Sequence, residues 1–492
     1  MLLSTALRIH PKDVVALAGG GGKTTAMFRL AEELRALNRR VVTTMTTKIF
    51  VAQMACAPAH LILETEDALL ARLGPALAQH GHVLIAGGSI VEQDKVQGVP
   101  PELLDRVAAQ PAVDAVIVEA DGSRRLPFKA PAAHEPVIPA STTILAPMVG
   151  LDVVGAPLDE AHVHRPERVA ALAGAALGDP VTPELVAAVL AHPDGGAKGL
   201  PPGARLVPIL NKVTDEWLPA ARQIARLLLA YPAVDSVLIA AVAEPDPVRE
   251  VWGRVAAVVL AAGEAKRFGS LKQVLPWRGR PLVAHVAAQA LACPDIARVA
   301  VTVGAEAERV TVALAELSPD VPGTSQVTGT WRPLSALHIV PVPNWAAGQS
   351  RSVIAGLKAL AAPTPDPSPV PTVEGSWPPP LLPPPSQRGR VGVGAILFLL
   401  ADQPGVTPQL LSALIRRHRE TLAPVVAPRH AGQRGNPVLF DRATFPEFAA
   451  LTGDIGARPI IQAHADAIAW VDWPTPEILQ DIDSAEDYRP PE

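Results

Sequence analysis

Short apolar runs alternate with amphipathic stretches along the first half of the chain. The apolar runs lie at residues 13–18, 40–44, 61–63, 82–86, 113–118 and 206–210. Ala-rich stretches of helical period separate several of them, and one carries Met27, Leu30, Leu34 and Leu37 on a single face. Strands that are apolar throughout, separated by helices, are typical of a parallel sheet covered on both faces. This half is therefore predicted to be α/β.

The second half repeats the alternation after a brief hinge expected at Arg249–Arg254. Its strands are expected at residues 255–260, 299–303, 339–341 and 395–400, and its helices at residues 281–291 and 350–360. The predicted fold class is α/β, with two doubly wound parallel-sheet domains. The expected domains are residues 1–248 and residues 249–492, and the second is expected to be Rossmann-like.

Proline interrupts this pattern inside the second domain. Eleven of the 53 prolines lie between Pro363 and Pro385, where neither an ordinary helix nor a central strand can form. The apolar run that follows, at residues 395–400, must be a buried strand. Residues 362–392 are therefore expected to be a disordered or extended surface insertion, with docking of a proline-binding partner as the weaker alternative.

The composition of the 492-residue chain narrows the classes of function. A net charge of −5 offers no polyanion-binding surface and aromatic residues make up only 4%, so no nucleic-acid partner is expected. The cysteines, Cys56 and Cys293, are far apart, which argues against a disulfide framework or a structural zinc site. No apolar run approaches the ~18 residues of a membrane span, and the N-terminus lacks the layout of a signal peptide. A soluble, cytoplasmic protein is expected.

A glycine-rich loop, Gly19–Thr25, joins the first apolar run to the helical stretch that follows. Backbone N–H groups of such a loop and the helix N-terminus bind phosphate, Lys23 neutralises charge, and the Thr24 hydroxyl reaches Mg²⁺. The match to G-x-x-x-x-G-K-[ST] is imperfect, because Leu17 stands where the first glycine belongs. A bare flexible loop is the alternative to a P-loop-like domain. The predicted nucleotide-binding residues are Gly20, Gly21, Gly22, Lys23, Thr24 and Thr25.

Two carboxylates, Glu119 and Asp121, follow the apolar run at residues 113–118. Ligands of parallel sheets lie at the carboxyl ends of the strands, so one of these carboxylates could hold or orient Mg²⁺ opposite the glycine loop. A simple strand-end turn is the alternative. Thr24, Glu119 and Asp121 are thus the predicted metal ligands of the first domain.

The motifs of the first domain resemble those of the YqeC-type accessory proteins of selenium-dependent molybdenum hydroxylases. They occupy residues 19–25, 43–48, 119–122, 129–131 and 134–136. The resemblance implies that the glycine loop binds a nucleotide, and by position it makes Lys129, His134 and Glu135 candidates for a second ligand. A loop histidine such as His134 is more often a hydrogen-bonding residue than a catalyst.

The base of that nucleotide stays open. Asn211-Lys212-Val213-Thr214-Asp215 resembles the Asn-Lys-x-Asp element with which GTPases read guanine, but Asp215 comes one residue late. Either ATP or GTP is possible in the first domain.

The second domain carries the sequence Leu260-Ala261-Ala262-Gly263, followed by Arg267 and Lys272. Such a loop can bring backbone N–H groups close to a nucleotide while Arg267 and Lys272 meet its phosphates. Taken alone, the spacing could also mark a surface turn with solvated charges. Downstream, Asp402 ends another apolar run, and a carboxylate there can hold Mg²⁺ beside the α-phosphate.

These motifs resemble those of the molybdenum-cofactor cytidylyltransferases, the MocA-like NTP transferases, from about Ala256 to Ile468. Leu-Ala-Ala-Gly with Asp-Gln-Pro is closer to this CTP-using branch than to the guanylyl branch. Glu264, Phe268 and Asn436 depart from the commonest residues of the family. Arg267, Lys272 and Asp402 are the expected catalytic residues, and Asp454 is expected to share the metal with Asp402. The expected nucleotide-binding residues are Leu260, Ala261, Ala262, Gly263, Gly348, Ser350 and Ser352.

The two resemblances together imply a fusion protein in molybdenum hydroxylase maturation. Its second domain is expected to transfer CMP from CTP to the molybdopterin cofactor, with Mg²⁺, and to release pyrophosphate. An apo molybdenum hydroxylase is a possible partner. One alternative is a nucleotidyltransferase that uses GTP, or a sugar or alcohol phosphate as acceptor. The other is a non-catalytic chaperone that delivers the cofactor.

Overall fold

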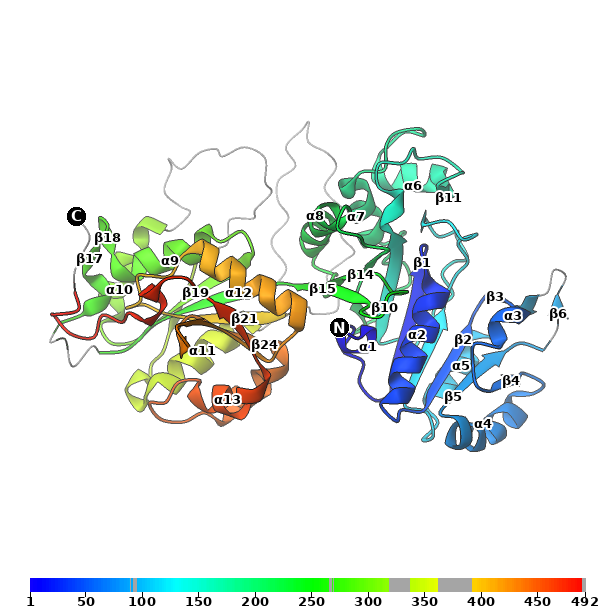
Figure 1. Cartoon of the computed structure of the whole chain (residues 1–492), viewed down its shortest axis with the longest axis horizontal. Coiled ribbons are helices and arrows are strands. Elements are labelled where there is room, and N and C mark those ends of the chain that lie inside the picture. The colour runs from blue at the N-terminus through cyan, green and yellow to red at the C-terminus, as the bar shows by residue number, and fades with distance from the viewer. Residues whose placement is uncertain are drawn as a thin grey trace. The chain divides into compact units, whose positions relative to one another are not determined.

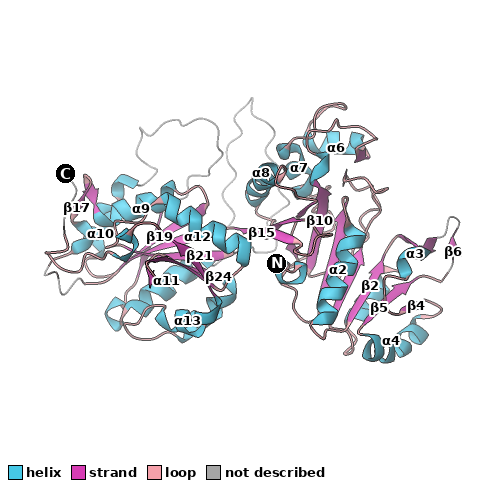
Figure 2. Ribbon diagram, in the orientation of Figure 1, coloured by secondary structure: helices cyan, strands magenta, loops and turns pink. Residues whose placement is uncertain are grey.

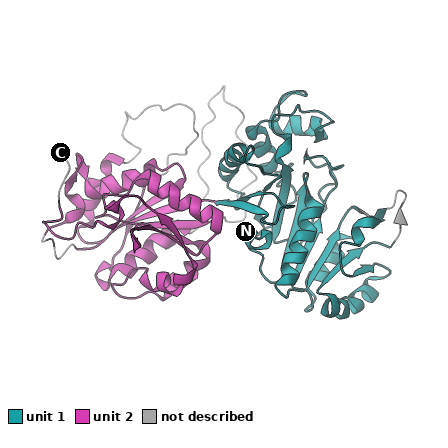
Figure 3. Ribbon diagram, viewed as in Figure 1, with its two compact units in different colours: residues 1–252, 365–391 teal, residues 253–364, 392–492 magenta. Residues whose placement is uncertain are grey.

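The computed structural model of the chain contains two compact units (Figure 1; Figure 3). It describes all residues except 89, 92–94, 265–267, 269, 318–336, 362–391 and 489–492. Unit 1 ends at Trp252 and unit 2 begins at Gly253. Arg267 and the expected proline-rich insertion, apart from Gly392, lie outside the described residues.

Unit 1 is built on a ten-stranded sheet. Its strands are β1 (Asp13–Gly19), β2 (Val41–Met45), β4 (His60–Ile62), β5 (His82–Ala86), β8 (Ala115–Glu119), β10 (Ile144–Gly150), β12 (Arg205–Leu206), β13 (Ile209–Asn211), β14 (Ser236–Ala240) and β15 (Val248–Gly253). They follow the order β15-β14-β13-β10-β1-β8-β2-β5-β4, with β12 beside β10. The pairings from β14 to β4 are parallel. Five successive residues of β1 are buried, so both faces of the sheet are covered.

The helices of unit 1 connect these strands (Figure 2). Two of them have threonine N-caps whose hydroxyls accept a backbone N–H bond: Thr65 caps α4 and Thr182 caps α7. The helices are α1 (Leu3–Ala6), α2 (Lys23–Ala36), α3 (Val51–Met54), α4 (Glu66–His80), α5 (Pro101–Ala108), η1 (Leu151–Val153), α6 (Pro166–Ala173), α7 (Pro183–Ala191) and α8 (Leu218–Leu229).

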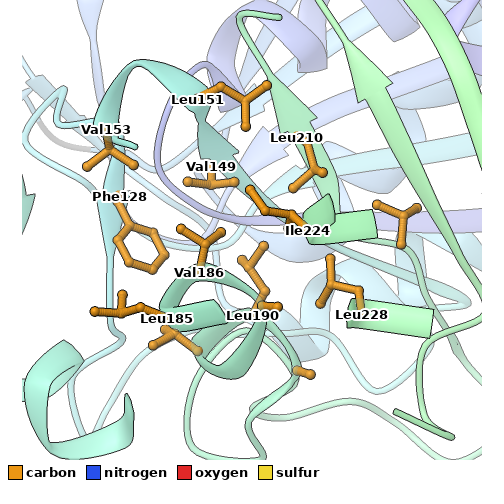
Figure 4. Packing of buried hydrophobic residues seen from close by; sticks show 14 of the residues in the cluster. Phe128, Val149, Leu151, Val153, Leu185, Val186, Leu190, Leu210, Ile224 and Leu228 are labelled. Atoms are coloured by element: carbon orange, nitrogen blue, oxygen red, sulfur yellow. The ribbon is translucent and has the colours of Figure 1, made fainter. Parts of the chain in front are cut away.

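Part of the core of unit 1 lies between β10, β13 and the helices α7 and α8 (Figure 4). Val149 and Leu210 from the strands meet Val186 and Ile224 from the helices, and all four are fully buried. Phe128 is buried at the edge of this cluster and belongs to strand β9 (Phe128–Lys129). The hydrophobic cluster therefore fixes the chain segment that runs from Asp121 toward β9.

Two small sheets accompany the main one. β9 (Phe128–Lys129) pairs in parallel with β11 (Val163–His164), and β3 (Lys48–Phe50), β7 (Lys95–Gln97) and β6 (Ile90–Val91) form the other. Most of the segment expected as a hinge, Arg249–Arg254, is strand β15, and the division between the two units falls within it. Val248, Val251 and Trp252 bury their side chains, and this burial holds the segment in the sheet.

Unit 2 contains an eight-stranded mixed sheet. Its strands are β16 (Val255–Ala261), β19 (Ile296–Val303), β20 (Leu337–Pro341), β21 (Ala395–Leu400), β22 (Val425–His430), β23 (Gln433–Arg434), β24 (Val438–Asp441) and β25 (Ile468–Asp472). The order is β20-β19-β16-β21-β24-β22-β23, with β25 beside β22. Strands β20, β19, β16 and β21 are parallel, whereas β24 is antiparallel to both of its neighbours. The expected class, α/β with two doubly wound and mainly parallel sheets, is confirmed.

The helices of unit 2 include α11, which packs on β16 through Gly356 and Val258. No helix among the described residues is long and apolar enough to cross a membrane. The remaining elements are η2 (Lys272–Val274), β17 (Pro276–Trp277), β18 (Arg280–Pro281), α9 (Leu282–Ala292), α10 (Ala307–Ala313), η3 (Ala315–Leu317), η4 (Trp345–Ala347), α11 (Gln349–Ala361), α12 (Pro408–Thr421), η6 (Arg442–Ala450), α13 (Arg458–Ala463), η7 (Ala465–Ala467) and η8 (Pro476–Leu479).

Candidate functional site

The glycine loop of unit 1 leaves the carboxyl end of β1, which lies between β8 and β10. The loop packs closely against neighbouring backbone: Gly21 has a φ of +77°, and a Cβ there would lie 2.2 Å from the Gly150 nitrogen. Asn211 holds the loop from the other side, because its Nδ2 donates to the Gly21 carbonyl at 2.6 Å. The same side chain accepts from Val242 N at 2.9 Å. Asn211 therefore supports the loop in this structure.

Lys23 and Thr24 open helix α2 and turn toward Glu119, the last residue of β8, and Asp121, which follows it. Lys23 Nζ donates to the Gly19 carbonyl at 2.6 Å and lies 3.3 Å from Asp121 Oδ1. The Thr24 hydroxyl donates to Glu119 Oε2 at 2.8 Å. The structure thus brings together four of the expected site residues, while Thr25 on α2 is exposed.

Asp121 continues into a buried ionic network. Its Oδ2 lies 3.0 Å from Lys129 Nζ, and Lys129 in turn donates to Glu135 Oε2 at 2.7 Å. Arg165 reaches the same Glu135 oxygen at 2.7 Å. Lys129 and Glu135, expected around a second ligand, are therefore bonded to each other, whereas His134 is exposed.

Burial and ion pairing shift the pKa values of two acids, Glu119 and Glu135, in opposite directions. Burial raises the pKa of Glu119, and the opposing effects of Lys23 and Thr24 do not cancel it. Burial acts in the same direction on Glu135, but the bonds from Arg165 and Lys129 outweigh it and lower the Glu135 pKa to about 2. Glu135 is therefore ionised at neutral pH and pairs with both cations.

Unit 2 contains a cavity of about 730 Å³ at the carboxyl ends of β16 and β21. This volume is within the usual range for a small-molecule site. Of the expected nucleotide-binding residues, Ala261 is buried in the strand and Ser350 is fully buried. The others line the cavity: Leu260, Ala262, Gly263, Gly348 and Ser352.

Lys272 and Asp402 meet in this cavity at 2.5 Å. Lys272 also lies 3.0 Å from Asp483 and donates to the Ile482 carbonyl at 3.0 Å. Burial works to lower the pKa of Lys272, but Asp402 and Asp483 together outweigh it and leave that pKa raised. Lys272 is thus a charged ammonium group that can exchange its ion pairs with these carboxylates for an ion pair with a phosphate.

Sequence reasoning missed the C-terminal segment Asp481–Asp483. Ile482 N donates to the Asp402 carbonyl at 3.1 Å, and Gln403 donates to Asp481. Burial and the neighbouring Asp402 and Asp483 raise the pKa of Asp481. The available signal in the sequence was a pair of carboxylates flanking one apolar residue, and only the fold brings that pair to Asp402.

The start of α11 also lines the cavity. Gly348 has a φ of +109°, and a Cβ there would lie 2.4 Å from the Gly453 carbonyl group, so the two chain segments touch. Asp454 Oδ1 accepts from Gln349 N at 3.0 Å. The helix begins at Gln349, so neither Ser350 nor Ser352 is its N-cap. Among the residues that the structure describes, the Ser350 hydroxyl has no hydrogen-bond partner.

The carboxylates of unit 2 have the oxygen ligands that a hard divalent cation prefers, but they do not form a preorganised metal site. Among the described residues no group of three acidic, histidine or cysteine side chains could hold a metal ion. Asp402, Asp454 and Asp483 nevertheless line one cavity, and the described part of the chain offers the buried Asp402 Oδ1 no hydrogen-bond partner. Oxygen ligands of this kind are the ones Mg²⁺ takes, together with substrate phosphates and water.

Comparison with known proteins relates the two units to separate families. A family described as YqeC protein matches residues 15–167, and the MobA-like NTP transferase domain matches residues 257–468. The uncharacterized protein YqeC of Escherichia coli K12 is 35% identical over 204 residues, which cover 41% of this chain and 77% of that protein.

Solved structures are similar over about half of the chain. The crystal structure of an Rv0371c homolog from Mycobacterium sp. strain JC1 is 26% identical, with a TM-score of 0.34, and covers 48% of this chain and 93% of that one. The Mycobacterium tuberculosis Rv0371C complex with manganese is 22% identical, with a TM-score of 0.32, and covers 48% of this chain and 96% of that one.

Proposed function

Because this chain belongs to the YqeC family through unit 1 and carries a MobA-like NTP transferase domain in unit 2, we propose that it is a molybdenum-cofactor cytidylyltransferase fused to a nucleotide-binding accessory domain. Unit 2 transfers CMP from CTP to the molybdopterin cofactor and releases pyrophosphate. Unit 1 binds ATP or GTP at its glycine loop and serves the maturation of an apo molybdenum hydroxylase.

The observation that carries this proposal is the Lys272–Asp402 pair beside the Gly263 loop. The phosphates of CTP replace Asp402 as the ion-pair partner of the Lys272 ammonium group. Gly263 and Gly348, which have no side chain, let the nucleotide approach the backbone. A phosphate oxygen of the acceptor then attacks the α-phosphorus in line. The bond to the β-phosphate oxygen breaks, and pyrophosphate leaves with the electron pair.

Catalysis of this kind needs positioning and charge stabilisation more than covalent chemistry. Lys272 neutralises charge on the phosphates. Arg267, expected from the sequence to be catalytic, is proposed as a second cation with the same role. Asp402, Asp454 and the newly found Asp483 would hold Mg²⁺. When bound, that ion neutralises part of the triphosphate charge.

In unit 1 the same physical roles fall to different residues. Lys23 and the amides of Gly20–Gly22 bind phosphate, and Thr24 with Glu119 supplies oxygen ligands for Mg²⁺. Support comes from the 2.8 Å bond between the Thr24 hydroxyl and Glu119, which sets these ligands side by side.

The proposed transferase activity is tested by pyrophosphate release from the full chain with Mg²⁺ and molybdopterin cofactor, comparing CTP, GTP and ATP. We expect release with CTP, and little with the two purine nucleotides. The matched control is Asp472→Asn, which removes an exposed carboxylate at the end of β25 and should keep the wild-type rate.

Other outcomes assign unit 2 differently. A preference for GTP would move it to guanylyl transfer, and release only with a sugar or alcohol phosphate would change the acceptor. Tight binding of molybdopterin without turnover of any nucleotide would reject the transferase proposal and favour a chaperone that delivers the cofactor.

A further inference from the structure

We propose that Asp121 is an internal competitor for phosphate in unit 1, which holds the glycine loop closed on Lys23 until a ligand phosphate displaces it. The inference rests on the proposed nucleotide site and concerns its regulation. It gives Asp121 a role distinct from that of Glu119, which is bonded to Thr24.

Several of the donors that a phosphate needs are already occupied by groups of the protein. Gly19 N lies 3.1 Å from both carboxylate oxygens of Asp121. Lys23 Nζ lies 3.3 Å from the same carboxylate, and the Lys23 side chain is only 3% exposed. Asp121 therefore provides, inside the loop, the negative charge and the acceptor oxygens that a phosphate would bring.

The next two amides of the loop are also taken. Gly20 N donates to the Met148 carbonyl at 2.9 Å, and Gly21 N donates to the Leu126 carbonyl at 3.2 Å. Leu126 belongs to the segment between Asp121 and β9, so the carboxylate and this segment cover the loop together. A phosphate that enters must move Lys23 away from Asp121.

The ionic network makes this exchange energetically feasible. A buried carboxylate that loses its only cation costs about 3–5 kcal/mol. Asp121 avoids that penalty, because Lys129 Nζ lies 3.0 Å from its other oxygen and is itself fully buried. When Lys23 turns to a phosphate, Asp121 stays paired with Lys129. The second cation therefore makes the contact with Lys23 reversible.

The first arm of the test needs no ligand. Amide hydrogen exchange of residues 19–25 is measured in the full chain for the wild type, Asp121→Asn and Glu135→Gln. We expect faster exchange in Asp121→Asn alone, because Glu135→Gln removes a charge from the same network without touching the loop. Unchanged exchange in Asp121→Asn would overturn the proposal. If the amide variant folds poorly, Asp121→Ser removes the same charge with a smaller side chain.

The second arm titrates inorganic tripolyphosphate and follows protection of the same amides. Loss of a charged, hydrogen-bonded competitor should let Asp121→Asn bind at a concentration at least about tenfold lower than the wild type. Equal or weaker binding, or an equal gain in Glu135→Gln, would overturn competition. Faster exchange in Asp121→Asn with no binding to any of the proteins would instead remove the proposed nucleotide site, and the competition with it.

Discussion

Lys272 and Asp402 neutralise each other before any nucleotide arrives, at a separation of 2.5 Å. Asp402→Asn keeps the shape of the side chain and removes the charge proposed to hold the metal. We expect turnover to fall by about 10²- to 10³-fold, as for other single electrostatic groups of an active site. Pyrophosphate release measures the loss, and circular dichroism checks that the fold is intact. A normal rate in a folded Asp402→Asn protein would exclude Asp402 from the site.

His82 makes the stability of unit 1 depend on pH. Burial, with a smaller effect of Arg35, lowers the pKa of His82 to about 4, and its Nε2 lies 2.8 Å from the Thr43 hydroxyl. The unfolded chain, with an ordinary histidine pKa of about 6.5, binds the proton more readily than the folded protein. The stability is therefore present above pH 6.5 and is lost as the pH falls from about 6.5 toward 4.

The expected loss from His82 is about 2 kcal/mol between pH 7.5 and pH 5. The His82→Gln variant can keep a hydrogen bond to Thr43 but cannot titrate. Urea unfolding at both pH values should show the variant losing about 2 kcal/mol less than the wild type. An equal loss in the two proteins would mean that His82 does not titrate as inferred.

At the scale of elements, the loop after β1 depends on close backbone approach. Gly21→Ala places a Cβ 2.2 Å from the Gly150 nitrogen at a φ of +77°. Gly155→Ala has a similar φ of +85°, but its Cβ would meet no atom of the described residues within 4 Å. We expect about 3 kcal/mol of destabilisation from strain and overpacking at Gly21, and about 1 kcal/mol from strain alone at Gly155. Urea unfolding compares the two, and equal costs would show that the loop can move away.

The helices and strands that follow from local sequence patterns were the predictable part of this protein. The apolar run at residues 395–400 is strand β21 with the same bounds, and both family resemblances are confirmed. Contacts between residues far apart in sequence were not predictable. Lys272 meets Asp483 across 211 positions, and Asn211 reaches Gly21 across 190. No periodicity or spacing encodes such pairs, because the arrangement of the strands brings them together.

At the scale of the whole molecule, the described residues on either side of the proline-rich segment, Ala361 and Gly392, belong to unit 2. A Cβ on Gly392 would lie 2.9 Å from the Ala361 carbonyl oxygen, so the two ends of the segment are neighbours. Deleting residues 363–389 should therefore keep the soluble yield and lower the pyrophosphate release rate by less than about twofold, within the ±0.5 kcal/mol typical of surface changes. Loss of soluble protein would show that the segment is needed for folding.

The bond from Ile482 to Asp402 also means that the surroundings of Asp402 are completed late in synthesis, because Ile482 lies far along the chain. The parts of the glycine-loop site, ending with Val242, have all been translated before the ribosome begins unit 2. The transferase site receives its last known contributor only at Asp483. Since domains generally fold as they emerge, N-terminal first, the glycine loop and the residues that support it can fold well before the residues around Asp402 have all been synthesised.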